Sequence, residues 1–265
     1  MWVVLVVVLV GAAIFVGLTR TEVGRDQIRR QVETAFTQRF EGRLSIGTLR
    51  GTLIDDVVAT EVELRAPSGR LVATVDSIRA TPHWANLLTA ELSVQTLTLF
   101  RPRLSLERDT SGVWNLTKAL RRPSRSPPTD QPLDLSFADI EVRNGRVTTA
   151  RSGPAPPVVQ QGWLFDYSRT QVEDISLRAS AQRAGSNSVL DIQTASFELP
   201  DLNLESSLRR GRLRRTASGW SIAGLDLSVG TTRLRGTASV RTDPPGPNQS
   251  AFTLDLDRSR IANDE

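Results

Sequence analysis

The sequence contains no cysteine and a single histidine, and these absences exclude several classes of chemistry. Without cysteine the chain forms no disulfide, no thiolate metal site and no cysteine nucleophile. The histidine, His83, stands beside Trp84 in a predicted turn, where a lone histidine is far more often structural than catalytic. The adjacent Asp55 and Asp56 are also expected in a turn. The P-loop, G-x-G-x-x-G and G-x-S-x-G motifs are missing, so we predict no catalytic residue, no cofactor, no metal and no enzyme.

Lysine is almost absent, because Lys118 is the only one and every other basic side chain apart from His83 is arginine. This composition gives an isoelectric point near 10.6, although the net charge is only +4. Acidic and basic residues alternate along most of the chain, which favours a mixed, solvated surface over a nucleic-acid-binding one. The densest basic segment, Arg209–Arg215, is either a solvated strand or a patch that suits phosphate headgroups at least as well as nucleic acid.

Charge is also missing from the run Trp2–Leu18, which is almost entirely apolar. As a helix this run spans about 26 Å, close to the roughly 30 Å of a bilayer's hydrocarbon core. No small-residue cleavage site follows it, so we predict a single transmembrane anchor over residues 1–19 rather than a cleaved signal peptide. The arginines that follow the run would by themselves favour a cytoplasmic location for the rest of the chain.

Residues 20–41 have the pattern of an amphipathic helix. The apolar residues that form one stripe at helical spacing are Ile28, Val32, Ala35, Phe36 and Phe40. The remaining positions are mostly Arg, Gln, Glu and Thr. Two interpretations stay open: the helix covers the end of the next domain, or it lies at the membrane interface.

From residue 42 onward, alternating apolar residues predict a mainly β protein. A spacing of two apolar pairs, separated by two residues, recurs at Ala73–Ala80, Leu92–Leu99, Leu135–Val142 and Leu190–Phe197, with a shorter version at Leu44–Leu49. An inserted residue would turn every later side chain to the other face of a flat strand. A β-bulge absorbs that residue and keeps the apolar set on one face, so we predict a repeated, bulged strand. Pro102 marks an edge or a bend.

A Pro-rich segment, residues 121–132, divides this β-rich part into regions 42–120 and 133–265, and we predict that it is a linker. The two regions either continue one another as an open sheet or stack as a closed β core. The last predicted strand, residues 252–257, is followed by no closing element. We therefore expect an incomplete second region, further β repeats downstream, and self-association of residues 41–265 expressed alone.

The strand pattern, with the paired leucines Leu87 and Leu88, Pro102 and the G-x-W-N-L ending at 112–116, resembles the AsmA-like superfamily. Within it, the chain is similar to the TamB-like inner-membrane components of translocation and assembly modules in Gram-negative bacteria. The resemblance implies an N-terminal transmembrane helix, a short amphipathic helix and an elongated, twisted β-sheet groove without an enzyme site. It also implies a single-pass inner-membrane protein with its bulk in the periplasm.

The function that the resemblance implies is transport of phospholipid between the inner and outer membranes along an apolar groove. The alternative is a scaffold for outer-membrane protein assembly, working with a partner protein of an assembly module. An open sheet with one apolar face needs a covering layer, and acyl chains can supply it. The residues we expect to line the lipid groove are Ile78, Val94, Leu97, Leu99, Leu104, Leu106, Ile140 and Val142.

Overall fold

The structure is a computed structural model that describes residues 22–51, 56–82, 91–123, 134–151, 170–185, 187–241 and 251–260. The predicted anchor, residues 1–19, lies outside these ranges. The described helices are α2 (Glu22–Arg39), α3 (Asn115–Ala119) and the 3-10 turn η3 (Pro200–Leu202). The strands are β1 (Arg43–Gly51), β2 (Val57–Arg65), β3 (Leu71–Pro82), β4 (Glu91–Arg108), β5 (Asp134–Arg151), β6 (Gln171–Ala184), β7 (Asn187–Leu199), β8 (Leu204–Thr216), β9 (Gly219–Val229), β10 (Thr232–Arg241) and β11 (Ala251–Arg260).

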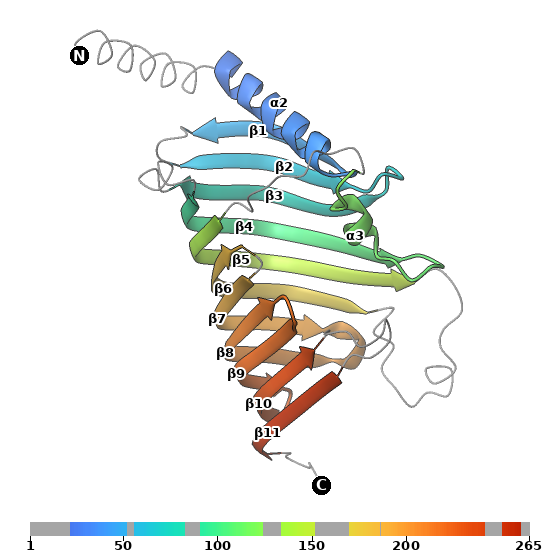
Figure 1. Cartoon of the computed structure of the whole chain (residues 1–265), viewed down its shortest axis with the longest axis vertical. Helices are drawn as coiled ribbons and strands as arrows, with labels where there is room; N and C mark the ends of the chain where they lie inside the picture. The colour runs from blue at the N-terminus through green and yellow to red at the C-terminus, as the bar shows by residue number, and fades with distance from the viewer. Residues whose placement is uncertain are drawn as a thin grey trace, which may run out of the picture.

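The described strands form one sheet in which each strand pairs with its neighbours in the sequence, from β1 to β11 (Figure 1). All pairs are antiparallel except β4 and β5, which run parallel. A parallel pair needs a crossover connection, and here that connection contains α3. The two predicted β regions therefore continue one another, with Leu97 opposite Ile140 and Leu99 opposite Val142. Most of the predicted linker, residues 121–132, lies outside the described residues. In the described part of the chain no second sheet covers the first.

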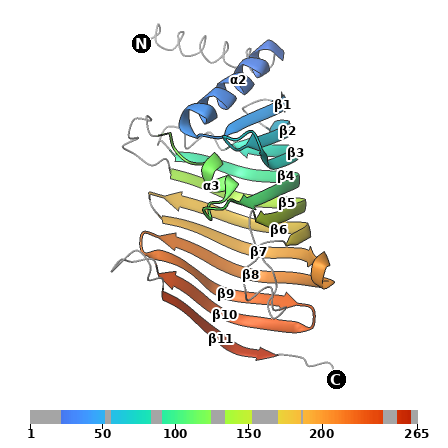
Figure 2. The same cartoon turned by 90° about the vertical axis from the view of Figure 1, so that its right-hand side faces the viewer.

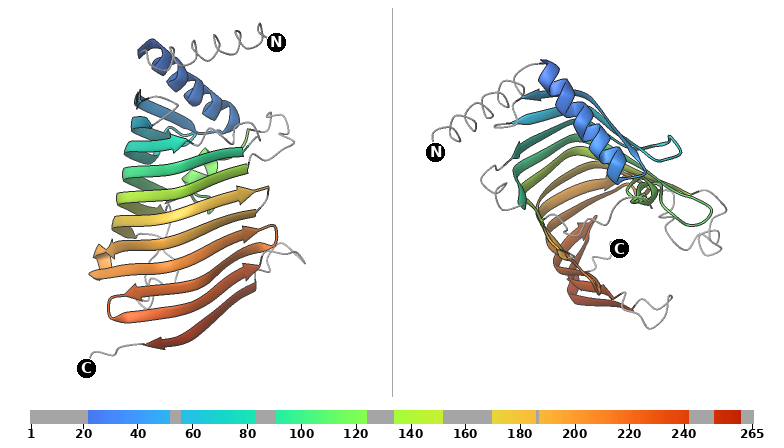
Figure 3. Two further views of the ribbon diagram at one scale, coloured as in Figure 1. Left: turned by 90° about the vertical axis from the view of Figure 1, so that its left-hand side faces the viewer. Right: turned by 45° about the horizontal axis from the view of Figure 1, so that its top comes forward.

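The sheet is elongated, twisted and curved. Its strands stack along the long axis of the molecule (Figure 2). Viewed from the top, the stack curves, and α3 lies on its inner side (Figure 3). Twist and curvature of this kind are expected where β-bulges recur along the strands.

Three of the five predicted bulges are confirmed by the strand register. The segments Leu92–Leu99, Leu135–Val142 and Leu190–Phe197 each contain a shift against a neighbouring strand. In each case the extra residue lies in the two-residue spacer between the apolar pairs. The apolar residues on both sides of the spacer therefore stay on one face.

The prediction of a bulge was wrong for the other two segments, where no register shift occurs. Around Leu44–Leu49 and Ala73–Ala80 the register is kept, because β1, β2 and β3 all carry their extra residue at the same level. Neighbouring strands thus change phase together. The middle member, Glu61 on β2, has a φ angle of 53°, which is uncommon for a residue other than glycine.

The same irregularity continues across the sheet and forms a crease. On β4, β5 and β6 the residues with positive φ are Arg101 (49°), Asn144 (54°) and Asp174 (47°). Pro102 lies next to Arg101 on the interior strand β4, so it marks a bend rather than an edge of the sheet. A proline is tolerated at this place because the regular pairing with β3 is already interrupted there.

Helix α2 covers the free edge of β1. The Ile46 N–H donates to Glu33 Oε1 (2.8 Å), and Arg29 Nη1 donates to the Ile46 carbonyl (3.1 Å). These side chains satisfy backbone groups that an edge strand would leave unpaired. The structure therefore supports the interpretation that the helix covers the end of the sheet, and the membrane-interface interpretation stays a prediction. The predicted apolar stripe does not make this contact as a whole, since Val32 is 44% exposed.

Helix α3 covers one end of the sheet's inner face. Ala119 is fully buried and packs with Val72 and Ala66. Asn115 fixes the helix to β4: its amide group donates to the Ser105 carbonyl (2.7 Å), and its Oδ1 accepts from the Glu107 N–H (3.0 Å). These bonds serve the part of β4 that extends beyond its pairing with β3.

Candidate functional site

An unbroken row of apolar side chains runs along the sheet from β1 to β10. Residues directly opposite one another on neighbouring strands lie on the same face, and the register connects one apolar residue from each strand in turn. We call this set the central row: Leu49, Ala59, Ile78, Leu99, Val142, Leu177, Ala195, Leu208, Leu227 and Leu234. The row follows the long axis of the molecule, so a ligand could contact ten strands along it.

The structure brings the eight predicted groove residues together on three adjacent strands. Ile78, Leu99 and Val142 belong to the central row. Leu97 and Ile140 form the next row, and Val94 lies opposite Phe137. On the other side of the crease, Leu104 lies opposite Val147 and Leu106 opposite Thr149. All eight side chains are partly buried, neither enclosed nor fully exposed.

Full burial of apolar residues is confined mainly to the N-terminal part of the sheet. One buried cluster contains Ile46, Val62 and Val75, with Ile78 and Leu99 packed against it. Beyond β4 the central row continues through leucines that are only partly buried. A contiguous apolar face that no second layer covers is typical of a surface that binds a partner or an apolar ligand.

The opposite face of the sheet is polar and carries ion pairs. Ser207, for example, is next in sequence to Leu208 of the central row, so it points to the other face. Ion pairs on this polar face include Arg178 with Asp139 (3.6 Å) and Arg212 with Asp191. The sheet therefore has one polar, solvated face and one apolar face.

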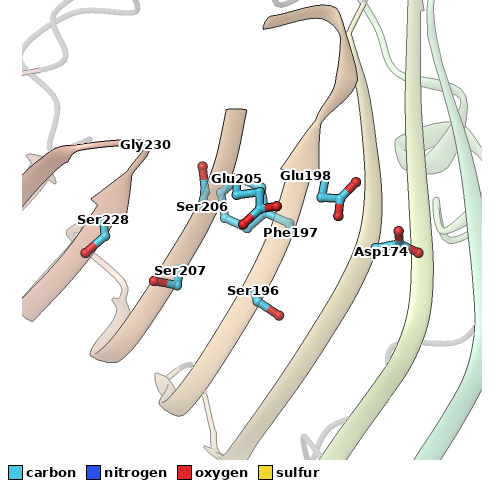
Figure 4. Close-up of a pocket in the computed structure, with 9 residues that line it drawn as sticks. All are labelled: Asp174, Ser196, Phe197, Glu198, Glu205, Ser206, Ser207, Ser228 and Gly230. Carbon is cyan, nitrogen blue, oxygen red and sulfur yellow. The ribbon is translucent and has the colours of Figure 1, made fainter. Parts of the chain in front are cut away.

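A polar hollow of about 490 Å³ lies across β6 to β9 (Figure 4). Its lining includes the carboxylates of Asp174, Glu198 and Glu205 together with serines from three strands. Among the described residues no group of His, Cys, Asp and Glu is arranged to hold a metal ion. We therefore assign this hollow to the solvated face.

The residues considered for catalysis give no site in the described structure. His83 and Asp55 lie outside the described residues. Asp56 stands just before β2 and accepts a hydrogen bond from Thr81 Oγ1 (2.5 Å), which ties two strand ends together. This contact is structural.

Sequence reasoning missed the second half of the central row. Leu177, Leu208 and Leu227 continue the face that begins at Ile78, yet none was predicted as a groove residue. The alternation of Leu225, Leu227 and Val229 was a usable signal for a half-buried strand. Which strand faces lie in line, however, depends on the register.

Comparison with known proteins agrees with the architecture. Among the described residues no helix is long and apolar enough to cross a membrane. A search of curated proteins finds no match. The model of the AsmA family matches residues 1–262. Since that match spans almost the whole sequence, the chain belongs to the AsmA family.

Proposed function

We propose that this protein carries phospholipid along the apolar face of its sheet during envelope biogenesis. The observation that carries the proposal is the central row, which crosses ten described strands without a covering sheet. Membership of the AsmA family is consistent with envelope biogenesis or lipid transport. In this proposal residues 1–19 anchor the chain in the inner membrane, the sheet extends into the periplasm, and the role is TamB-like.

Acyl chains fit the physical requirement of this face. Each methylene group moved from water into apolar surroundings stabilises a complex by about 0.8 kcal/mol. Partly buried leucines such as Leu99 and Leu177 gain contacts, while the headgroup of the lipid stays in water. Because the row has no polar interruption, a chain can move along it without losing apolar contact at any strand.

A second candidate function is a scaffold for outer-membrane protein assembly. The observation in its favour is the edge strand β11, which pairs only with β10 among the described residues. An exposed strand edge can accept a client strand by main-chain hydrogen bonds. Client cross-links along β11, without lipid on the apolar face, would favour this alternative.

The experiment that tests lipid carriage compares Leu99→Asp with Thr98→Asp. The two residues are neighbours on β4 and face opposite sides of the sheet. Lipid contact is measured with a photo-crosslinkable phospholipid, and folding by thermal melting. We expect Leu99→Asp to stay folded, because Leu99 lies at the margin of the buried cluster and is only partly buried, so the new carboxylate can reach water. The variant should lose most of its lipid cross-linking.

The control Thr98→Asp should leave cross-linking unchanged. If Leu99 instead belongs to a closed core, the buried charge will lower stability by several kcal/mol. Such a loss, together with no lipid cross-linking to the parent protein, would rule out the conduit.

A further inference from the structure

A small hollow on the apolar face lies near the ends of strands β5 to β9. Its volume is about 210 Å³, and its lining is mainly apolar. Phe137, Ala181, Leu190 and Leu213 lie opposite one another in turn and form a row on the same face, separated from the central row by the row that contains Ile140. The volume is below the roughly 300–1,000 Å³ of sites for drug-sized ligands. The hollow therefore suits part of one acyl chain rather than a whole lipid.

The mouth of this hollow carries two guanidinium groups. Leu135 lies opposite Arg183, Arg183 opposite Ser188, Ser188 opposite Arg215, and Arg215 opposite Trp220. We call this set the rim row. It continues the apolar face by one more step toward the strand ends, so Arg183 and Arg215 stand on the same face as the leucines and not on the polar face.

Two arginines of the polar face, Arg178 and Arg212, are paired with carboxylates, whereas among the described residues Arg183 and Arg215 are not. In the described part of the chain, neither Arg183 nor Arg215 lies within ion-pair distance of a carboxylate. Arg183 Nε donates only to the Gly185 carbonyl, at 3.4 Å. Both side chains are exposed and can bind an anion.

Trp220 adds a residue that favours the boundary between lipid and water. It lines the hollow and is 44% exposed. The Arg215 guanidinium carbon lies 5.3 Å from the centre of its ring, within the range of a cation–π contact. This contact holds the guanidinium at the mouth of the hollow. An indole ring with one side against apolar residues and the other in water fits the interface where lipid headgroups lie.

We infer that Arg183 and Arg215 bind the phosphate of a phospholipid whose acyl chain enters the hollow beside Leu213. The inference rests on the proposed lipid carriage and adds a headgroup site to it. Guanidinium groups recognise phosphate through paired N–H donors. The charge of the two arginines complements the phosphate, and the apolar lining complements the chain. One occupant thus satisfies both features.

The test uses the full chain and two acyl-photoreactive probes, phosphatidylglycerol and diacylglycerol, in vesicles of phosphatidylethanolamine. The probes differ in the phosphate headgroup. Adducts are located by mass spectrometry at the hollow and at Leu99. The variant Arg183→Gln/Arg215→Gln is compared with Arg209→Gln/Arg214→Gln, which removes the same charge from the polar face. Thermal melting checks that both variants fold.

In the parent protein we expect phosphatidylglycerol to label the hollow more strongly than diacylglycerol does. Arg183→Gln/Arg215→Gln should reduce this labelling about tenfold, the loss expected for charge-assisted contacts, with labelling at Leu99 kept. Arg209→Gln/Arg214→Gln should change neither. Raising the salt from about 0.05 M to about 0.5 M should weaken labelling of the parent protein by phosphatidylglycerol but not by diacylglycerol, because salt screens exposed charges. The salt measurement does not depend on any variant.

Two results would overturn the inference, and they are distinguishable. If the hollow is labelled equally in both double variants and the labelling does not change with salt, the headgroup site is disproved and lipid carriage is still supported. Absence of labelling by either probe, at the hollow and at Leu99, removes lipid carriage and the headgroup site together.

Discussion

Asp226 on β9 shows how one charged side chain is stabilised on the polar face. The side chain is 8% exposed and binds Arg233 through two hydrogen bonds of 2.7 Å. Arg235 lies 3.5 Å away. The hydrogen bond from Arg233 is the main cause that lowers the pKa of Asp226 from 3.8 to about 2, and burial opposes it. The ionised carboxylate is therefore favoured in the folded protein.

The shifted pKa of Asp226 predicts a specific pH dependence. Because the pKa is lower in the folded state than in the unfolded state, the stabilisation is complete above the unfolded value of 3.8. It is lost as the pH falls from there to about 2. Asp226→Asn should lower the thermal midpoint at pH 7, and its difference from the parent should shrink through this window. A difference that stays constant with pH would contradict the assignment.

Gly47 on β1 is required by the crease. A Cβ atom at this position would lie 2.6 Å from Glu61 Oε2 and 2.8 Å from Glu61 Cβ. Glu61 has a φ of 53°, a conformation that glycine adopts without strain. We predict that Gly47→Ala lowers the free energy of unfolding by about 1–3 kcal/mol, the usual cost of overpacking. Denaturant unfolding measures it.

The control for Gly47→Ala is the double variant with Glu61→Gly. Removal of the Glu61 side chain takes away both close contacts, so the cost of Gly47→Ala should shrink in this background. Equal costs in the two backgrounds would show that the crowding is not at Glu61.

At the scale of elements, helix α2 takes the place of a neighbouring strand along the free edge of β1. It does so with two side chains, Glu33 and Arg29, which bind the backbone of Ile46. We predict that Glu33→Ala speeds hydrogen exchange of the Ile46 amide about tenfold, because one hydrogen bond is worth about 1–1.5 kcal/mol. Exchange mass spectrometry of residues 43–51 measures it.

Gln38→Ala provides the matched control on α2. Gln38 is exposed, and its replacement should leave exchange in β1 unchanged. If Glu33→Ala also leaves the Ile46 amide protected, the edge of β1 is held by something other than these two side chains.

For the whole molecule, the two faces of the sheet should differ in their contact with lipid. The absence of cysteine allows single-cysteine spin labels to be introduced. We predict that labels at Val142 and Leu208 are protected from a polar relaxation agent when phospholipid is present. Labels at their neighbours Glu141 and Ser207 should stay accessible, because they face the polar side.

The comparison of labels with and without vesicles provides the control for this prediction. Protection of Val142 and Leu208 should require lipid. Equal accessibility of both faces in the presence of vesicles would contradict an apolar trough, whatever the family of the protein.

Local sequence determined the strands, their two faces and three of the bulges. The spacing around Leu97 and Ile140 predicted bulged strands that keep apolar residues on one face, because side-chain direction alternates along any strand. The same pattern predicted the eight groove residues on β3, β4 and β5. The resemblance to the AsmA-like superfamily also came from this spacing and is confirmed at the level of the family.

Tertiary structure decided which strands pair and which residues lie opposite one another. The parallel pairing of β4 with β5 makes one sheet of two regions, and it depends on the path of the crossover rather than on either strand. The bond between Glu33 and Ile46 joins residues that no pattern relates. Arg215 and Arg212 look alike in the sequence, yet only the register places Arg215 beside Trp220 on the apolar face. Pairing is a long-range choice between strands, and local periodicity carries no information about it.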